Sequence, residues 1–173
     1  DESVSAAGLI SWSWNFGDGG TSTLQHPQHV FASAGPYNVE LSVIDNNGCS
    51  DNISRQVINY PKPTASFSYT AACIGNAMQF MDASIGNGSS LISWLWDFGD
   101  GQQSINQNPQ HLYNAPGNYT VSLIVTTENG CTDTVVQTVS PYNPPTANFS
   151  WTSPCVLTAT QFTDLSIPGS GNI

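Results

Sequence analysis

The chain has 173 residues, of which 39% are hydrophobic and only 8% are charged, and its formal net charge is −10 with Arg55 and Lys62 as the two basic residues. So few basic groups exclude a nucleic-acid-binding surface, because affinity for nucleic acids comes mainly from Lys and Arg that neutralise phosphates. Five Trp, six Tyr and seven Phe are too many apolar rings for an intrinsically disordered chain, and they predict packed cores.

The most regular stretches of the sequence alternate apolar and polar residues, as strands do. In chain order they predict strands at 65–69, 78–80, 92–98, 119–125 and 134–139. Because alternate residues of a strand share a face, Ile92 is expected to point inward with Trp94 and Trp96. No stretch has the 3.6-residue apolar period of a helix, so the sequence predicts an all-β sandwich or barrel.

The sequence repeats itself without gaps at a spacing of 82 residues. The segment 9–19 reads Leu-Ile-Ser-Trp-Ser-Trp-Asn-Phe-Gly-Asp-Gly, and 91–101 reads Leu-Ile-Ser-Trp-Leu-Trp-Asp-Phe-Gly-Asp-Gly. The same offset carries Pro-Gln-His, Gly-Cys and Pro-Thr-Ala from one copy to the next. Such a repeat indicates an array of similar modules.

Proline-rich stretches near 60–63 and 141–145 mark the boundaries between modules, because proline removes strand donors and stiffens a connector. This phase predicts one complete module at 63–142. Residues 1–60 would be a module that lacks its first two strands, and residues 145–173 would be the first two strands of a third. Since an incomplete sandwich exposes half a core, we expect the natural polypeptide to continue in both directions.

Two aromatic positions in each repeat match an immunoglobulin-like sandwich. Trp14 and Trp96 stand where that fold places the tryptophan of its central strand, and Tyr37 and Tyr119 open the strand that would carry a tyrosine-corner contact. Stacking on a sugar or a cofactor is the alternative role for these rings. Core packing is the simpler interpretation, because half-buried strands alternate in this way.

Three ordered motifs run through both copies: Trp-Xaa-Trp-(Asp/Asn)-Phe-Gly-Asp-Gly, Asn-Pro-Gln-His-Xaa-Tyr and Gly-Xaa-Tyr-Xaa-Val-Xaa-Leu, with departures at Asn15, His26 and Phe31 in the first copy. With these motifs the chain resembles the PKD domain family over its whole length. The resemblance implies tandem immunoglobulin-like sandwiches, as found in surface adhesins and as accessory modules of secreted proteases and chitinases. The motif residues, expected to be structural, are Trp14, Phe16, Asp18, His29, Tyr37, Trp96, Phe98, Asp100, His111 and Tyr119.

The motif aspartates Asp18 and Asp100 lie between glycines, where positive φ and local hydrogen bonds to the Asp side chain favour a tight turn. A calcium site is the alternative, because some PKD-like modules resemble calcium binders. Its first candidates would be Asp82, Asp97 and Asp100. Calcium needs about six to eight oxygen ligands and the EF-hand spacing is absent, so apart from this weak candidate no cofactor is expected.

His29 and His111 recur in Pro-Gln-His, and His26 stands only in the first copy. A histidine pair spaced by three residues suggests a metal site, but no repeated partner or nearby thiolate accompanies it. The sequence also lacks a nucleophile elbow, a zinc-protease helix motif and a phosphate loop. We therefore predict loop histidines and no catalytic residues.

Cys49, Cys73, Cys131 and Cys155 give two cysteines per repeat, which is consistent with an oxidising extracellular setting and leaves their connectivity open. If Cys73 follows the first strand of the central module and Cys131 joins its last two strands, the two lie at opposite ends of one sandwich. A disulfide spans only about 4.4–6.8 Å between Cα atoms, so a bond within this module is not expected. Disulfides between adjacent modules are the hypothesis.

The predicted function is that of a non-catalytic structural or adhesive repeat of a large extracellular, cell-surface or fibre-forming protein, which acts as a stiff stalk or spacer. The alternative is a glycan- or substrate-binding accessory module of a secreted hydrolase, which would present a linear platform of exposed aromatics. Expected partners are neighbouring modules, other copies in a fibre or surface layer, and a glycan or cell-surface ligand. No run approaches the roughly 18 apolar residues of a membrane span, so no membrane insertion is expected within this sequence.

Overall fold

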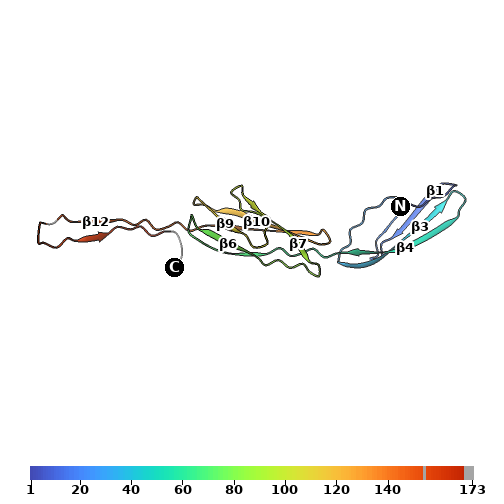
Figure 1. Ribbon diagram of the computed structural model, residues 1–173. Coiled ribbons are helices and arrows are strands. Elements are labelled where there is room, and N and C mark those ends of the chain that lie inside the picture. The colour runs from blue at the N-terminus through green and yellow to red at the C-terminus, as the bar shows by residue number, and fades with distance from the viewer. Residues whose placement is uncertain (154, 170–173) are drawn as a thin grey trace. The chain divides into compact units, whose positions relative to one another are not determined.

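The computed structural model describes residues 1–153 and 155–169 and contains only strands as regular elements (Figure 1). The predicted all-β class is thereby confirmed. The chain divides into two compact units, residues 1–61 and 62–173. Each unit is described by itself.

Two antiparallel sheets build the greater part of the second unit. One has three strands in the order β5-β6-β9, and the other has four in the order β11-β10-β7-β8. Their bounds are β5 (Phe67–Thr70), β6 (Ala77–Asp82), β7 (Leu91–Asp97), β8 (Gln103–Ser104), β9 (Gln110–Leu112), β10 (Tyr119–Thr127) and β11 (Thr132–Val139). These strands form the immunoglobulin-like β-sandwich that the sequence predicts, and we call them the central module.

Aromatic and branched side chains fill the space between the two sheets of the central module. Trp96 of β7 and Phe80 of β6 are fully buried, with ring centroids 5.7 Å apart. Phe67 of β5 meets the Trp96 indole edge-on at 5.1 Å. Strand β10 adds three fully buried residues at alternate positions, Val121, Leu123 and Val125. The tryptophan strand therefore points inward, and the core joins one sheet to the other.

The alternation predicted for 92–98 is wrong at its first residue. Ile92 is 60% exposed, whereas Leu91 packs against the core. Leu91 and Ser93 pair with consecutive residues of β10, so Ile92 is the extra residue of a β-bulge. A bulge inserts one residue and changes the side on which the preceding residues point. The first copy has the same irregularity next to Ile10, which is 58% exposed.

The first unit contains a single four-stranded sheet among its described residues, in the order β2-β1-β3-β4. Its strands are β1 (Leu9–Asn15), β2 (Thr21–Ser22), β3 (Gly35–Asp45) and β4 (Ser50–Asn59). At the 82-residue offset these are the counterparts of β7, β8, β10 and β11. The unit thus has the tryptophan-bearing sheet of the sandwich, and residues 1–61 form no second sheet to cover it.

A short hairpin follows the central module, made of β12 (Phe149–Trp151) and β13 (Phe162–Asp164). Its register matches that of β5 and β6: Phe149 is opposite Asp164, as Phe67 is opposite Asp82. The described residues of this segment form a two-stranded sheet only. We call it the β12–β13 hairpin.

Candidate functional site

The Phe-Gly-Asp-Gly motif forms the turn between β7 and β8. Gly99 and Gly101 have φ values of 76° and 89°, which L side chains rarely adopt. The Asp97 carboxylate accepts the N–H of Gly99 at 2.9 Å, and the Asp100 carboxylate accepts the N–H of Gln102 at 3.0 Å. The motif aspartate therefore stabilises a tight turn, as the sequence suggests.

His111 connects this turn to the core. Its Nε2 atom lies 2.8 Å from Oδ2 of Asp100, and its ring stacks on Phe98 with centroids 4.0 Å apart. Tyr113 meets the His111 ring edge-on at 4.5 Å and donates its hydroxyl to the carbonyl of Phe98 at 2.9 Å. Burial raises the pKa of the Tyr113 hydroxyl. The imidazole is thus enclosed by aromatic rings and held by one carboxylate.

Tyr119 continues the series of stacked rings. It stacks on Tyr113 at 4.0 Å and donates its hydroxyl to the carbonyl of Ala115, four residues upstream, at 2.9 Å. This is the tyrosine-corner-like contact that the sequence predicts at this position. Together with Trp96 and Phe98, these rings form a continuous aromatic stack through the module.

The first unit reproduces the same constellation. His29 lies 2.7 Å from Asp18 and stacks on Phe16 at 4.0 Å, and Tyr37 donates its hydroxyl to the carbonyl of Ser33 at 2.9 Å. The hydrogen bond from His29, followed by that from the Gly20 N–H, holds the pKa of Asp18 below its ordinary value. The same contacts between Asp, His and aromatic rings thus occur in both copies, which indicates a structural role for these residues.

The three calcium candidates are engaged separately. Asp82 accepts the indole N–H of Trp94 at 2.7 Å and the side-chain amide of Gln107 at 3.0 Å, while Asp97 and Asp100 hold the turn. Across the part of the chain that the structure describes, no three His, Cys, Asp or Glu side chains are grouped to hold one metal ion. A calcium ion needs about six to eight oxygen ligands, and a site at these residues stays a prediction.

Sequence reasoning missed the contact between Asp82 and Trp94 and that between Trp96 and Asn106. The indole of Trp96 donates to the carbonyl of Asn106 at 2.9 Å. The corresponding Trp14 donates to the carbonyl of Leu24 at 3.0 Å. In both copies the indole and its acceptor are ten residues apart. This spacing predicts the contact only when the geometry of the hairpin between them is already known.

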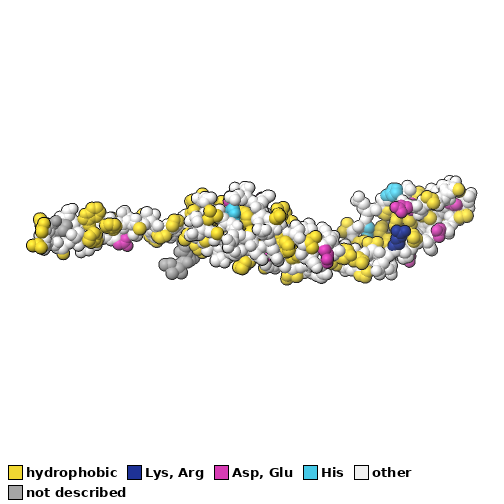
Figure 2. Space-filling model, viewed as in Figure 1, with side chains coloured by type: hydrophobic (Ala, Val, Ile, Leu, Met, Phe, Trp, Pro, Cys, Tyr) yellow, Lys and Arg dark blue, Asp and Glu magenta, His cyan; other side chains and the backbone are white. Residues whose placement is uncertain are grey.

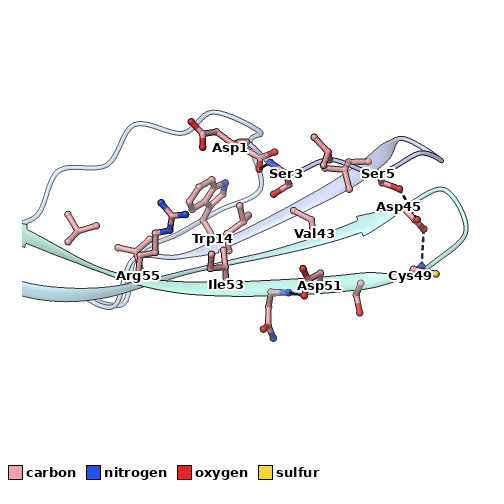
Figure 3. A pocket seen from close by; sticks show the side chains of 18 residues that line it. Asp1, Ser3, Ser5, Trp14, Val43, Asp45, Cys49, Asp51, Ile53 and Arg55 are labelled. Carbon is pink, nitrogen blue, oxygen red and sulfur yellow. Dashed lines mark hydrogen bonds between the residues drawn. The ribbon is translucent and has the colours of Figure 1, made fainter.

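A concavity lies on the first unit, over one side of its four-stranded sheet (Figure 3). It has a volume of about 820 Å³, and Figure 3 shows Trp14, Val43 and Ile53 on its floor, with Arg55 beside them. We call this side of the sheet the open face. Its lining residues on the strands include Leu9, Trp14, Val39, Leu41, Val43, Ile53, Arg55 and Val57.

The open face corresponds, residue for residue, to core positions of the central module. At the 82-residue offset, Trp14 is the counterpart of Trp96, and Val57 is the counterpart of Val139. Trp96 and Val139 are fully buried beneath β5 and β6, whereas Val57 is 41% exposed. The concavity therefore lies over positions that belong to the core of the repeat, and Asp1, Asp45, Asp51 and Arg55 are among the residues that line it.

The cysteines fall where strand phase places them. Cys73 lies in the loop between β5 and β6, where its backbone forms an isolated parallel β-bridge with that of Tyr142. Cys131 lies in the turn between β10 and β11. Cys49, Cys73 and Cys155 carry free thiols. Disulfides between modules therefore stay a prediction.

The visible surface is mostly neutral, with few acidic or basic side chains and apolar patches on both units (Figure 2). Seven aromatic or aliphatic residues of the final segment are about half exposed or more: Phe149, Trp151, Val156, Leu157, Phe162, Leu165 and Ile167. In the described part of the chain, no helix has the length and hydrophobicity needed to cross a bilayer.

Comparisons with known proteins place these observations in a family. The model of the PKD domain family matches residues 2–60 and 60–140. Collagenase ColA of Bacillus cereus is 44% identical over 61 residues, which are 35% of this chain and 6% of that protein. Pre-pro-metalloprotease PrtV of Vibrio cholerae is 37% identical over 65 residues, which are 38% of this chain and 7% of that protein.

Solved structures of isolated PKD domains are also similar. The PKD1 domain of Vibrio anguillarum Epp is 32% identical, with 48% of this chain and 96% of that chain covered and a TM-score of 0.46. The PKD1 domain of Vibrio cholerae metalloprotease PrtV is 32% identical, with 47% and 98% covered and a TM-score of 0.45. The matches with the two curated proteins span only 6–7% of their length. With two tandem matches over most of its residues, this chain belongs to the PKD domain family.

Proposed function

We propose that this chain is a non-catalytic structural repeat of an extracellular protein, where it serves as a spacer or stalk. The observation that carries the proposal is the burial of the aromatic motif. Trp96 is fully buried and Phe98 is 2% exposed, so the rings that define the repeat stabilise its interior. A carbohydrate-binding platform would instead present such rings to solvent in a row.

The polar motif residues support the same role. Asp100 and His111 are hydrogen-bonded to each other, and Asp100 also accepts the N–H of Gln102 in the turn. The ring of His111 is covered by Phe98 and Tyr113. No buried side-chain nitrogen or oxygen among the described residues lacks a hydrogen-bond partner. A catalytic site needs groups that are free to meet a substrate, and these groups are already occupied by the fold.

An extracellular location is part of the proposal. Low charge, polar Ser, Thr, Asn and Gln at the surface and two cysteines per repeat suit a protein outside the cell. Similarity to segments of a collagenase and of a pre-pro-metalloprotease supports this location. We also propose that the repeat comes from a surface adhesin, a filament or a stalk.

The second candidate is an accessory module that binds the substrate of a secreted hydrolase. The observation in its favour is the 44% identity to a segment of a collagenase. Exposed rings of the β12–β13 hairpin would be its platform. Against it, the equivalent rings of β5 and β6 are core residues in the central module, so these positions of the repeat serve packing there.

A sedimentation assay distinguishes the two candidates. The folded chain is incubated with insoluble collagen, chitin or cellulose, and the fraction that pellets is measured against an unrelated β-sandwich of similar charge. A spacer is expected to remain in the supernatant like the control. Saturable binding to any of these polymers that is lost on Trp151→Ala would contradict the spacer and support the accessory module.

A further inference from the structure

We propose that the first and last strands of the central module form a load-bearing seam, which resists tension applied along the chain. Strand β5 is an edge strand of one sheet, and β11 is an edge strand of the other. Hydrogen bonds join these two edges from the point where the chain enters the module to the point where it leaves. The proposal rests on the spacer role proposed above, because only a chain that is pulled at both ends would use such a seam.

Two side chains of β11 fasten the entry half of the seam to β5. The carboxylate of Asp133 accepts the N–H of Ala65 at 2.8 Å, and the side-chain amide of Gln137 donates to the carbonyl of Phe67 at 2.9 Å. Both bonds are partly buried, which strengthens them relative to the same bonds in water. These side chains replace the main-chain ladder that a neighbouring strand would provide.

A main-chain bridge continues the seam at the exit end. The N–H of Tyr142 donates to the carbonyl of Ala72 at 3.0 Å, and the N–H of Ile74 donates to the carbonyl of Tyr142 at 2.9 Å. These two bonds form the isolated parallel bridge between Cys73 and Tyr142. The segment that leaves the module is therefore fastened to the loop that follows β5.

The two sides of the seam run in the same direction. Residues 65, 67 and 72–74 on one side contact residues 133, 137 and 142 on the other, so the numbers rise together. The chain enters this module before β5 and leaves it after β11. Tension therefore pulls β5 back toward its start and β11 forward toward its end, and the bonds between them are loaded in shear.

Shear loading makes these bonds act together. Parallel bonds that are pulled along the strand direction share the force, whereas the bonds of a hairpin pulled at its open end break one after another. Forced unfolding is governed by the unfolding rate, and this rate depends on the contacts that are lost on the way to the transition state. The seam should therefore contribute more to the lifetime of the module under tension than to its lifetime at rest.

The core anchors the seam against sliding. Phe67 provides the carbonyl that Gln137 binds, and its ring is 5% exposed and meets the indole of Trp96 edge-on at 5.1 Å. At the exit end, the N–H of Gly75 donates to the carbonyl of the buried Tyr113 at 3.1 Å. Movement of β5 along β11 would thus draw a ring out of the interior as well as break the hydrogen bonds.

The test stretches the full chain at constant force by handles at its two ends, in reductant, and measures how long the central module survives. Its unfolding is recognised by the length that residues 64–142 release when they extend. The same variants are unfolded in urea without force. Comparison of the two rates separates a seam that bears load from a general loss of stability.

Substitutions on β11 test the side-chain half of the seam. Gln137→Ala is expected to shorten the lifetime under force about three- to tenfold, the usual effect of losing one hydrogen bond, and to change the rate in urea less. Asp133→Ala should shorten it about tenfold or more, because the lost acceptor is charged. Asp133→Asn retains an oxygen for the N–H of Ala65 and should restore most of the lifetime.

Two controls define what the seam must do. Thr138 follows Gln137 on β11, is exposed and points to the other side of the strand, so Thr138→Ala should leave the lifetime unchanged. Met78 of β6 is fully buried and lies off the seam. Met78→Ala should therefore accelerate unfolding in urea more than under force, the opposite order to Gln137→Ala.

Three results would each overturn the seam. They are alanine variants of Asp133 and Gln137 that survive as long as the unchanged chain, a loss in Thr138→Ala equal to that in Gln137→Ala, and a loss under force in Met78→Ala as large as that in Gln137→Ala. The spacer role is tested separately by the sedimentation assay. Polymer binding in that assay would remove the spacer role and leave the measured seam in place, so the two failures are distinguishable.

Discussion

At the scale of single residues, the repeat is stabilised by side chains that serve the interior. Trp96 touches Phe67, Phe80 and Phe98, and its indole N–H has a backbone acceptor, so its apolar and polar parts are both satisfied. A tryptophan in this position leaves neither a void nor an unpaired donor. Its removal should therefore affect the free energy of unfolding far more than that of an exposed neighbour.

We expect Trp96→Ala to lower the free energy of unfolding of the central module by about 3–5 kcal/mol, because the deleted indole leaves a cavity and its carbonyl partner without a donor. Chemical denaturation followed by near-ultraviolet circular dichroism measures the change. Ile92→Ala on the same strand is the control and should cost well under 1 kcal/mol, since Ile92 is 60% exposed. Equal losses in both variants would contradict the assigned bulge.

Acid should destabilise the chain through its hydrogen-bonded carboxylates. Burial raises the pKa of Asp82, but hydrogen bonds from Ser84, Gln107 and Trp94 outweigh it, and the pKa is lowered overall from 3.8. Asp18 is lowered mainly by the hydrogen bond from His29. Because the folded pKa values lie below the unfolded ones, the unfolded chain binds protons first as the pH falls.

The stability from these groups is therefore complete above about pH 5 and is lost as the pH falls through the lowered folded values. Thermal unfolding from pH 7 downward measures it. We expect Asp82→Asn to be less stable at pH 7 but to lose less on acidification than the unchanged chain. A transition temperature that rises on acidification would contradict this assignment.

At the scale of elements, the turn between β7 and β8 shows why two glycines of one motif are not equivalent. Both have positive φ, but a Cβ on Gly99 would lie 2.6 Å from the carbonyl oxygen of Thr120, whereas a Cβ on Gly101 would meet nothing within 4 Å. Gly99 is needed for close approach to β10 as well as for its backbone conformation.

We predict that Gly101→Ala costs about 1–2 kcal/mol, the usual penalty for an L residue with positive φ, and that Gly99→Ala costs clearly more. Urea unfolding of the two variants under the same conditions gives the comparison. The extra loss arises because the backbone of β10 must move to admit a methyl group. If the two variants were equally stable, the close contact with Thr120 would not exist in solution.

Strand β9 illustrates how context decides an element. The Gln-His pair of the Pro-Gln-His sequence lies in strand β9 in the central module, whereas in the first unit the same pair lies in an irregular segment. Local propensity is the same in both, so the difference comes from the pairing partner β6. Short edge strands of this kind exist only when a neighbour accepts their hydrogen bonds.

At the scale of the whole molecule, the dominant property is a formal net charge of −10 with only two basic residues. Copies of like charge repel each other over about 10 Å at an ionic strength of 0.1 M, and this range shrinks as salt is added.

The sequence by itself determined the repeat, the strand class and the family, because these depend on local alternation and on residues that recur at a fixed spacing. It also assigned Trp96, Tyr119 and Asp100 to core, corner and turn, since each type has a strong local preference in such a position. Pattern alone suffices where one face of a strand must be buried.

Only the tertiary structure decided the rest. The outward position of Ile92 depends on a register shift against β10. His111 was predicted to lie in a loop, but it lies in strand β9 because β6 pairs with it, and its contact with Asp100 depends on how β9 meets the turn between β7 and β8. Asp82, Asp97 and Asp100 were candidates for one site, yet each found separate donors. Contacts between distant segments are set by how sheets pack, and no periodicity along the chain encodes that geometry.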